Sequence, residues 1–309
     1  MPDTIHNKPA SLIKVIIAFA IIYIVWGSTY FFVQAALRDF PPFVLGSLRF
    51  LASGFILLAW CVVRKYKLVY RPQMKTSFIV GNLLLFIGNG SIIWAEETLP
   101  SSLVAVLISS LPLWIVLFDT RNRKANFSSR YILTGIFTGL AGVVLLFSEK
   151  IFSNHSPGTG TLQIVSLLVV VAGNICWALG SLYSKYNARG NTTVGAAWQM
   201  IFAALSFLIV SFSTGEVSHF HFHEIHLRAW LSVIYLVTLG SLAGYSAYIW
   251  LLQVRSATQV STNAYVNPVV AVLLGVFFGG ETINGLQIGG LSVILLSVFI
   301  INFEKYKRT

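Results

Sequence analysis

The sequence predicts an all-α integral membrane protein with ten transmembrane helices, arranged as two inverted five-helix repeats with both termini in the cytoplasm. The first observation is composition: of 309 residues, 56% are hydrophobic and only 10% are charged, whereas soluble domains carry about 25% charged residues. The second is that the apolar residues form ten stretches separated by short gaps. The third is that positive charge is concentrated in every second gap, the pattern of cytoplasmic loops.

The ten stretches are each about long enough to span a hydrocarbon core of ~30 Å at ~1.5 Å per helical residue. They cover residues 12–34, 42–63, 76–95, 100–118, 131–148, 162–184, 195–214, 229–252, 258–279 and 285–303. The first follows Lys8 and Lys14, as in a signal peptide, but it continues through Trp26 without an evident cleavage site. We therefore expect it to be the first spanning helix.

The loop charges set the orientation. Seventeen of the 21 basic residues lie at the termini or in the gaps after the second, fourth, sixth and eighth stretches: Lys8, Lys14, Arg64, Lys65, Lys67, Arg71, Lys75, Arg121, Arg123, Lys124, Arg130, Lys185, Arg189, Arg255, Lys305, Lys307 and Arg308. The opposite gaps hold only Arg38, Lys150 and Arg228. Topology thus accounts for the net charge of +11, and no nucleic-acid partner is expected.

An internal repeat divides the chain into two halves. Residues 83–118 align with 239–274 at a constant offset of 156, with eight identities that include Trp94/Trp250 and Pro112/Pro268. Because five is odd, the second half must enter the membrane from the opposite side. We expect repeats at 1–148 and 162–309, joined by an external linker at 149–161. Inverted repeats are typical of secondary transporters, whose substrate site lies near the midplane between the halves.

Several ordered motifs carry a family resemblance. They are Trp26-Gly27-Ser28-Thr29-Tyr30-Phe31, Pro41-Pro42 with Arg49-Phe50, Gly88-Asn89-Gly90, Pro100-Ser101-Ser102 through Pro112-Leu113-Trp114, Ala264-Tyr265-Val266-Asn267-Pro268-Val269, and Gly279-Gly280-Glu281-Thr282. In these the chain resembles the EamA family of the drug/metabolite transporter (DMT) superfamily, in its YedA-like branch. The resemblance implies a ten-helix plasma (inner) membrane carrier, often an exporter of small metabolites, amino acids or drugs. One departure is that the first half lacks an acidic counterpart of Glu281.

Arg49 is the one basic residue clearly inside a spanning stretch. Burying such a charge costs at least ~2.5–3.5 kcal/mol, so it usually faces a cavity or a partner. One interpretation is contact with an anionic group of the substrate. The alternative is a side chain that extends to the interface or satisfies backbone carbonyls. The repeat places neutral Gln199 at the equivalent position.

Four asparagines lie near the middle of the stretches, at Asn89, Asn174, Asn263 and Asn267, and Asn82 lies nearer the cytoplasmic end of its stretch. Asn263 and Asn267 share a helix face, and Pro268 frees a carbonyl one turn earlier. These groups suit a polar ligand, or they serve as interhelical hydrogen bonds worth about 0.6 kcal/mol each.

Aromatic residues supply the other candidates. Trp26, Trp177, Tyr245 and Tyr248 could line a substrate pocket. The alternative is an interfacial belt, and this is the favoured interpretation of Tyr30 and Trp250.

The remaining residues point to a carrier without a cofactor or metal. The acidic residues sit at helix ends, and no carboxylate or histidine lies at mid-depth, so a buried proton relay is not expected. Cys61 and Cys176 lie in apolar stretches and imply no disulfide or metal framework. We therefore predict a secondary transporter of small organic solutes. The alternative is a membrane enzyme acting on a lipid-like or amphipathic substrate, but no catalytic motif supports it.

Two glycine pairs predict close helix packing. Gly135-x-x-x-Gly139 and Gly285-x-x-x-Gly289 lie in the last helix of each half. The same spacing is compatible with dimerisation, so either a monomer or a homodimer is expected.

The charge distribution makes a topological prediction. Tags inserted at residue 155 should be reachable from outside the cell, and tags at residues 69 or 126 only from the cytoplasm. Labelling with membrane-impermeant reagents in intact and permeabilised cells measures this. External labelling at residue 126 would contradict the predicted orientation.

Overall fold

The structure is a computed structural model that describes residues 11–99, 101–146, 148, 161–220, 225–279 and 284–306. Its regular elements are helices, with no strand among these residues. The helices of the first half are α1 (Leu12–Ala36), α2 (Pro42–Val63), α3 (Arg71–Val80), η1 (Gly81–Asn89), α4 (Gly90–Ala95), α5 (Ser101–Ile108), α6 (Leu111–Phe118), α7 (Arg123–Ser128) and α8 (Arg130–Leu146). Those of the second half are α10 (Thr161–Asn187), α11 (Thr192–Ser213), α12 (Glu216–His219), α13 (Leu227–Tyr235), η3 (Leu236–Tyr245), α14 (Ser246–Val254), α15 (Ala257–Val260), α16 (Asn263–Gly279) and α17 (Gly285–Tyr306).

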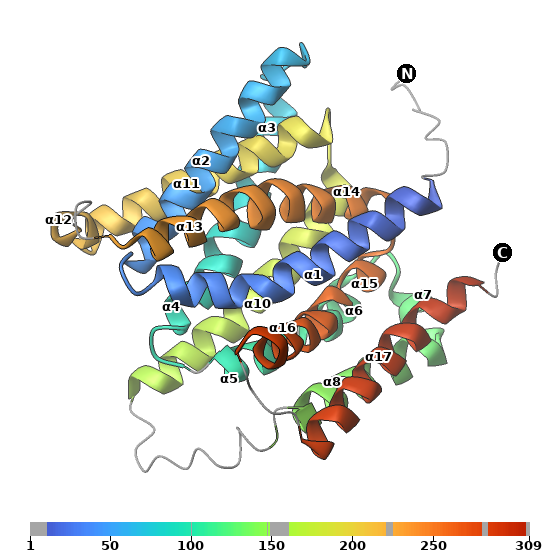
Figure 1. The fold of residues 1–309 in the computed structure, drawn as a ribbon. Coiled ribbons are helices and arrows are strands. Elements are labelled where there is room, and N and C mark those ends of the chain that lie inside the picture. The colour runs from blue at the N-terminus through green and yellow to red at the C-terminus, as the bar shows by residue number, and fades with distance from the viewer. Residues whose placement is uncertain are drawn as a thin grey trace, which may run out of the picture.

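Every predicted apolar stretch is mainly helical where it is described, with turns at 109–110 and 261–262, and seven helical spans are long and apolar enough to cross a membrane. These spans are Leu12–Ala36, Pro42–Val63, Arg71–Ala95, Leu162–Asn187, Thr192–Ser213, Leu227–Val254 and Gly285–Asn302. Val104–Phe118 and Arg130–Leu146 are shorter apolar helices. The count of ten and the cytoplasmic termini stay predictions. Glu281 and most of the predicted linker lie outside the described residues. Figure 1 places the start of α1 and the end of α17 on the same side of the molecule.

Irregular backbone recurs at matching places in the two halves. The third span of each half contains a π-helical segment, η1 at Gly81–Asn89 and η3 at Leu236–Tyr245. The offset of 156 found in the sequence maps the first onto residues 237–245. Pro112 and Pro268 are equivalent in the repeat, and the helical backbone is interrupted ahead of each of them, between α5 and α6 and between α15 and α16. Such interruptions in corresponding helices of two repeats are typical of a transporter's binding region.

The two halves exchange their first helices. Helix α1 packs against α13, η3, α14 and α16 of the second half, and α10 packs reciprocally against α3, η1, α4, α5 and α6 of the first. Figure 1 shows α1 running between α13 and α16. Helix α2 packs along α11, and α8 packs along α17 at one edge of the molecule. The third and fourth spans of each half lose regular α-helical backbone where they face the exchanged helices α1 and α10.

Close packing of α8 on α17 uses the predicted Gly135 and Gly139 on α8, but not the predicted Gly285 and Gly289 on α17. A Cβ at Gly135 would lie 3.1 Å from the carbonyl oxygen of Ser297, and one at Gly139 would lie 2.7 Å from Ser297 Oγ. A Cβ at Gly290 would lie 2.6 Å from the backbone nitrogen of Leu146, and one at Gly142 would lie 3.0 Å from the backbone nitrogen of Ile294. By contrast, a Cβ at Gly285 would meet nothing within 4 Å, and one at Gly289 only Leu145 at 3.7 Å. On α17 the close approach to α8 is therefore at Gly290, one residue beyond the predicted Gly289.

This geometry predicts unequal costs for two identical substitutions on α17. Gly290→Val should destabilise the purified protein by about 1–3 kcal/mol, because rigid backbone cannot move aside for the added methyl groups. Gly285→Val is the matched control and should leave the unfolding temperature nearly unchanged. Thermal unfolding in detergent measures both. Equal unfolding temperatures for the two variants would contradict the packing described here.

Candidate functional site

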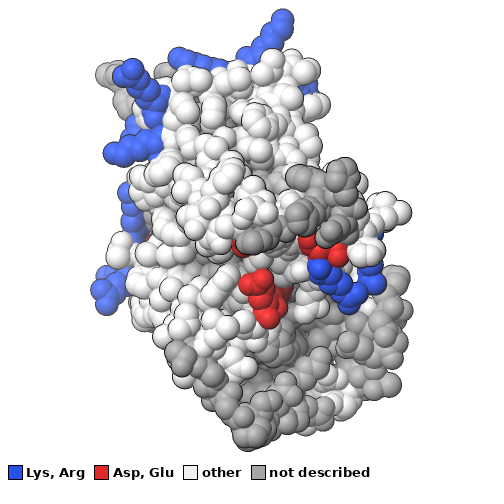
Figure 2. Space-filling model, turned by 90° about the vertical axis from the view of Figure 1, so that its left-hand side faces the viewer, with Lys and Arg blue, Asp and Glu red and all other residues white. Residues whose placement is uncertain are grey.

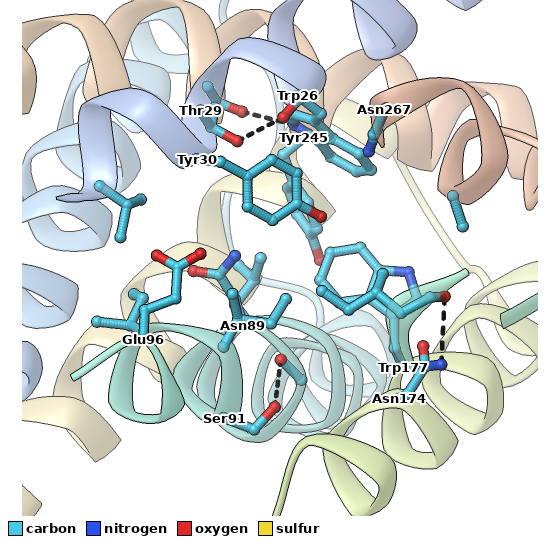
Figure 3. Close-up of a pocket in the computed structure, with 18 of the residues that line it drawn as sticks. Trp26, Thr29, Tyr30, Asn89, Ser91, Glu96, Asn174, Trp177, Tyr245 and Asn267 are labelled. Carbon is cyan, nitrogen blue, oxygen red and sulfur yellow. Dashed lines mark hydrogen bonds between the residues drawn. The ribbon is translucent and has the colours of Figure 1, made fainter. Parts of the chain in front are cut away.

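A single large cavity lies between the two halves, with about 870 Å³ of space that includes its open mouth. Helices α1, α2, α10 and α16 and the segments η1, α4 and η3 line it. Figure 3 shows Trp26, Tyr30, Asn89, Trp177 and Asn267 converging on this space. Eight of the nine candidate residues from the sequence line it: Trp26, Arg49, Asn89, Asn174, Trp177, Tyr245, Asn263 and Asn267.

Tyr248 is the ninth candidate, and it lies beneath the cavity. Its ring packs against Trp26 at 5.0 Å and against Trp177 at 5.6 Å between centroids, and the two tryptophans meet edge-on at 5.6 Å. Trp177 Nε1 donates to the Tyr248 hydroxyl at 2.9 Å, and Trp26 Nε1 donates to the carbonyl of Gly240 at 3.0 Å. The three rings form an aromatic floor that joins α1, α10 and α14.

A group of hydrogen bonds made by Lys185, here called the Lys185 clasp, lies on the side of the aromatic floor that faces away from the cavity. Lys185 Nζ donates to the carbonyls of Leu252 at 2.9 Å and Arg255 at 2.6 Å, so α10 holds the C-terminal end of α14. The Tyr186 hydroxyl donates to the Asp119 carboxylate at 2.6 Å. This side carries the basic loops that the charge pattern predicts to be cytoplasmic, and the cavity is closed toward it.

Arg49 presents a buried positive charge to the cavity. Its side chain is 4% exposed, and its Nε donates to Ser241 Oγ at 2.9 Å. The guanidinium carbon lies 4.9 Å from the Phe50 ring centroid. In the described part of the chain, no Asp or Glu oxygen lies within 4.0 Å of its nitrogens; the ion pair found there joins His226 to Asp39. The guanidinium therefore has polar and aromatic neighbours but no contacting carboxylate.

The four amides divide into two roles. Asn174 Nδ2 donates to the carbonyls of Leu107 and Ile108, at 3.0 and 3.3 Å, and to Ser110 Oγ at 3.0 Å. The Ile108 carbonyl has no N–H partner one turn later, because residue 112 is proline, and Asn174 satisfies it. The Leu107 carbonyl also accepts the backbone N–H of Ser110 at 3.1 Å. Asn263 and Asn267, only 4% and 5% exposed, each line the cavity with a buried Oδ1 that accepts no hydrogen bond. The same is true of Asn89 Oδ1. Buried polar atoms normally find partners, so these three oxygens are the acceptors open to a ligand.

Two lining residues were missed by sequence reasoning. Tyr30 was expected at the interface, but it lines the cavity. Glu96 does end its helix as expected, as the C-cap of α4, yet its carboxylate oxygens are buried and the residue lines the cavity. An acidic group therefore does reach the enclosed space, which the search for mid-helix carboxylates did not anticipate. The sequence signal for a buried acidic group was the adjacent pair Glu96 and Glu97. Neighbouring residues at a helix end point in different directions, so one of the two can face inward.

Two further acidic residues, Glu97 and Glu216, lie close enough to each other to interact, and Glu97 follows Glu96 in the chain. Figure 2 shows acidic side chains near the middle of the face that carries α12, with most lysines and arginines toward its edges. Burial raises the pKa of Glu97, and the nearby Glu216 carboxylate raises it further. Glu216 Oε2 accepts the backbone N–H groups of Phe43 and Val44, both at 3.0 Å, and so caps α2 from another element.

Comparisons with known proteins agree with this architecture. The profile of the EamA-like transporter family matches twice, at residues 13–148 and 164–303. The chain belongs to this family. It is 33% identical over 290 residues to the uncharacterized inner membrane transporter YedA of Escherichia coli K12, covering 92% of this chain and 89% of that protein.

More distant relatives extend the comparison. A probable amino-acid metabolite efflux pump of Salmonella typhimurium is 22% identical, with 91% of this chain and 92% of that protein covered. A protein of known crystal structure superposes with a TM-score of 0.77 at 18% identity, covering 96% of this chain and 99% of that one. That likeness shows the shared fold. The EamA membership and the apolar helices identify a multi-pass membrane transporter.

The two amide roles predict different mutational effects. Asn174→Ala should lower the free energy of unfolding by about 1–3 kcal/mol, because it leaves the Ile108 carbonyl unsatisfied at the helix interruption. Asn267→Ala removes an oxygen without a partner and should cost under about 1 kcal/mol. Thermal unfolding of the ligand-free protein compares them. A greater loss of stability in Asn267→Ala than in Asn174→Ala would reverse the assignment.

Proposed function

We propose that the protein is a secondary transporter that exports small organic solutes with an anionic group across the plasma membrane by alternating access. The proposal includes ten spanning helices, two inverted repeats and cytoplasmic termini. The observation that carries it is Arg49: a buried guanidinium that lines a large cavity between the two halves, with no carboxylate in contact among the described residues.

Electrostatics argues for an anionic ligand. A cation within the membrane costs at least ~2.5–3.5 kcal/mol, and this cost falls when an anion binds beside it. A carboxylate suits a guanidinium because it accepts two parallel hydrogen bonds. The free Oδ1 atoms of Asn263 and Asn267 would accept hydrogen bonds from donors elsewhere on the same solute. The Salmonella relative's name, an amino-acid metabolite efflux pump, is compatible with a solute of this kind.

The cavity's shape supports alternating access. Its lining includes Tyr30, Val33 and Glu96, near the helix ends that the charge pattern predicts to be external. The aromatic floor and the Lys185 clasp close the opposite side. In this proposal the structure is the outward-facing state, from which an exporter releases its solute. The cavity's described lining offers no histidine or cysteine, and nothing in it favours the alternative of a membrane enzyme.

Counterflow in proteoliposomes tests the transport proposal. Purified protein should give saturable exchange of a labelled carboxylated metabolite against an excess of the same compound inside. A thermal-shift screen of metabolites selects the compound, because a bound ligand raises stability by RT ln(1 + [L]/Kd). Consumption of the solute without exchange would instead establish an enzyme.

Arg49→Gln should weaken binding of the carboxylated solute by about 1–3 kcal/mol, since it removes a charge-assisted hydrogen bond. Arg38→Gln, on an exposed residue outside the cavity, is the matched control and should bind like the wild type. Ligand titrations followed by thermal shift give both dissociation constants. An unchanged dissociation constant in a folded Arg49→Gln protein would show that Arg49 has a structural role only.

A further inference from the structure

A second, smaller cavity lies on the predicted cytoplasmic side. It has about 320 Å³ of space, including its opening, between α3, α10, α11 and α14, next to the turn that joins α10 to α11. Most of the residues that line it are of polar types, among them Gln73, Ser77, Gln199 and Gln253, with Arg189 from the turn. A polar lining of this kind is unusual for packed helices in lipid, where interfaces are made mainly of small and apolar residues.

One hydrogen bond joins the linings of the two cavities. Tyr245 lines the large cavity and Gln199 lines the small one. The Tyr245 hydroxyl donates to Gln199 Oε1 at 2.7 Å, and both side chains are buried. The wall between the two spaces is therefore one pair of side chains thick at this point.

The position of Gln199 in the repeat gives it a counterpart in Arg49. Each is the seventh residue after the first residue of its helix, Arg49 on α2 and Gln199 on α11. Both bind the π-helical segment η3, Arg49 through Ser241 and Gln199 through Tyr245, four residues further on. The equivalent residues of the two halves thus hold one irregular segment. Segments of π-helix occur frequently at functional sites.

Two features of the Tyr245–Gln199 contact favour its separation. Tyr245 and Gln199 are both neutral, so separating them leaves no unpaired ion in the membrane. Gly195 lies one turn before Gln199, and a Cβ there would lie 3.9 Å from Gln199 Nε2 and 3.2 Å from Gln73 Nε2. Because this position carries no side chain, the amide of Gln199 has space beside it.

We infer that the second cavity is the cytoplasmic half of the solute route, and that the Tyr245–Gln199 pair is the barrier that opens between the two halves. This inference rests on the proposed transport function and adds the route and its gate. The Lys185 clasp on α14 lies at the same end of the molecule, and it would be released when α14 moves away from α10.

Cysteine accessibility tests the barrier. Ser77→Cys places a thiol in the second cavity, in a protein whose native Cys61 and Cys176 are replaced by alanine. The probe is methanethiosulfonate ethylsulfonate, an impermeant anion that suits a cavity containing a guanidinium. In otherwise wild-type protein, the thiol should react readily from the cytoplasmic face of inside-out vesicles and slowly from outside in intact cells.

Substitutions that weaken the barrier should change only the rate at which the thiol is labelled from outside. Tyr245→Phe keeps the ring and removes the donor, and Gln199→Ala removes the acceptor. Each should speed external labelling of the thiol by about tenfold, the factor expected from loss of one buried hydrogen bond. Gln259→Ala is the matched control, since Gln259 also makes one side-chain hydrogen bond, to Asn302 Oδ1 at 3.3 Å, and lines neither cavity.

Two results would overturn the inference. One is external labelling at the wild-type rate in both variants while cytoplasmic labelling stays normal. The other is a thiol that does not react from the cytoplasmic face at all. Labelling needs no transported solute, whereas wild-type counterflow in the same preparation tests the proposed function. Intact counterflow with unchanged labelling refutes the gate alone, and absent counterflow with the predicted labelling refutes transport alone.

Discussion

The fold depends on one constraint, namely that hydrocarbon provides no hydrogen-bond partners for the backbone. Each unsatisfied N–H or C=O in lipid costs several kcal/mol, so irregular backbone survives only where protein or water satisfies it. In this structure the π-helical segments η1 and η3 and the interruption between α5 and α6 face the cavity or the opposite half. Asn174 shows how this is achieved, because its amide binds the carbonyls at that interruption. The irregular helices line the cavity, and their backbone is tolerated because it faces the cavity or the opposite half and not lipid.

The exchange of first helices places those irregularities together. Since α1 belongs to one half and packs on η3 and α16 of the other, Trp26 meets Gly240 across the boundary. Helix α10 does the same for η1 and α4, which brings Trp177 against the first half. Neither half could enclose the cavity by itself. Movement of one half relative to the other must therefore change the cavity's walls, which is the geometric requirement for alternating access.

The polar groups of the site are distributed unequally between the two halves. Arg49 supplies a charge on α2 where the equivalent position on α11 supplies the neutral Gln199. The amide oxygens without partners come mainly from α16, and the acidic residues lie near the mouth. A symmetric pair of halves thus encloses a site with a positive group near the centre and negative groups near the opening. This arrangement selects the orientation of a bound solute as well as its charge.

The sequence by itself determined the class of the protein, the helical stretches and the repeat, and eight of the nine residues that it proposed for the site do line the cavity. These follow from local patterns, because hydropathy, loop charge and a constant offset do not depend on packing. Only the tertiary structure decided which face each residue presents. It placed Tyr248 in the aromatic floor beneath the cavity, Tyr30 and Glu96 in the cavity lining, and Gly290 instead of Gly289 against the backbone of α8. It also distinguished Asn174, whose amide group donates hydrogen bonds to backbone carbonyls, from Asn267, whose Oδ1 accepts no hydrogen bond. The reason is physical: along an apolar helix the hydrophobic pattern does not distinguish lipid from protein, so the direction of each side chain is set by contacts between distant parts of the chain.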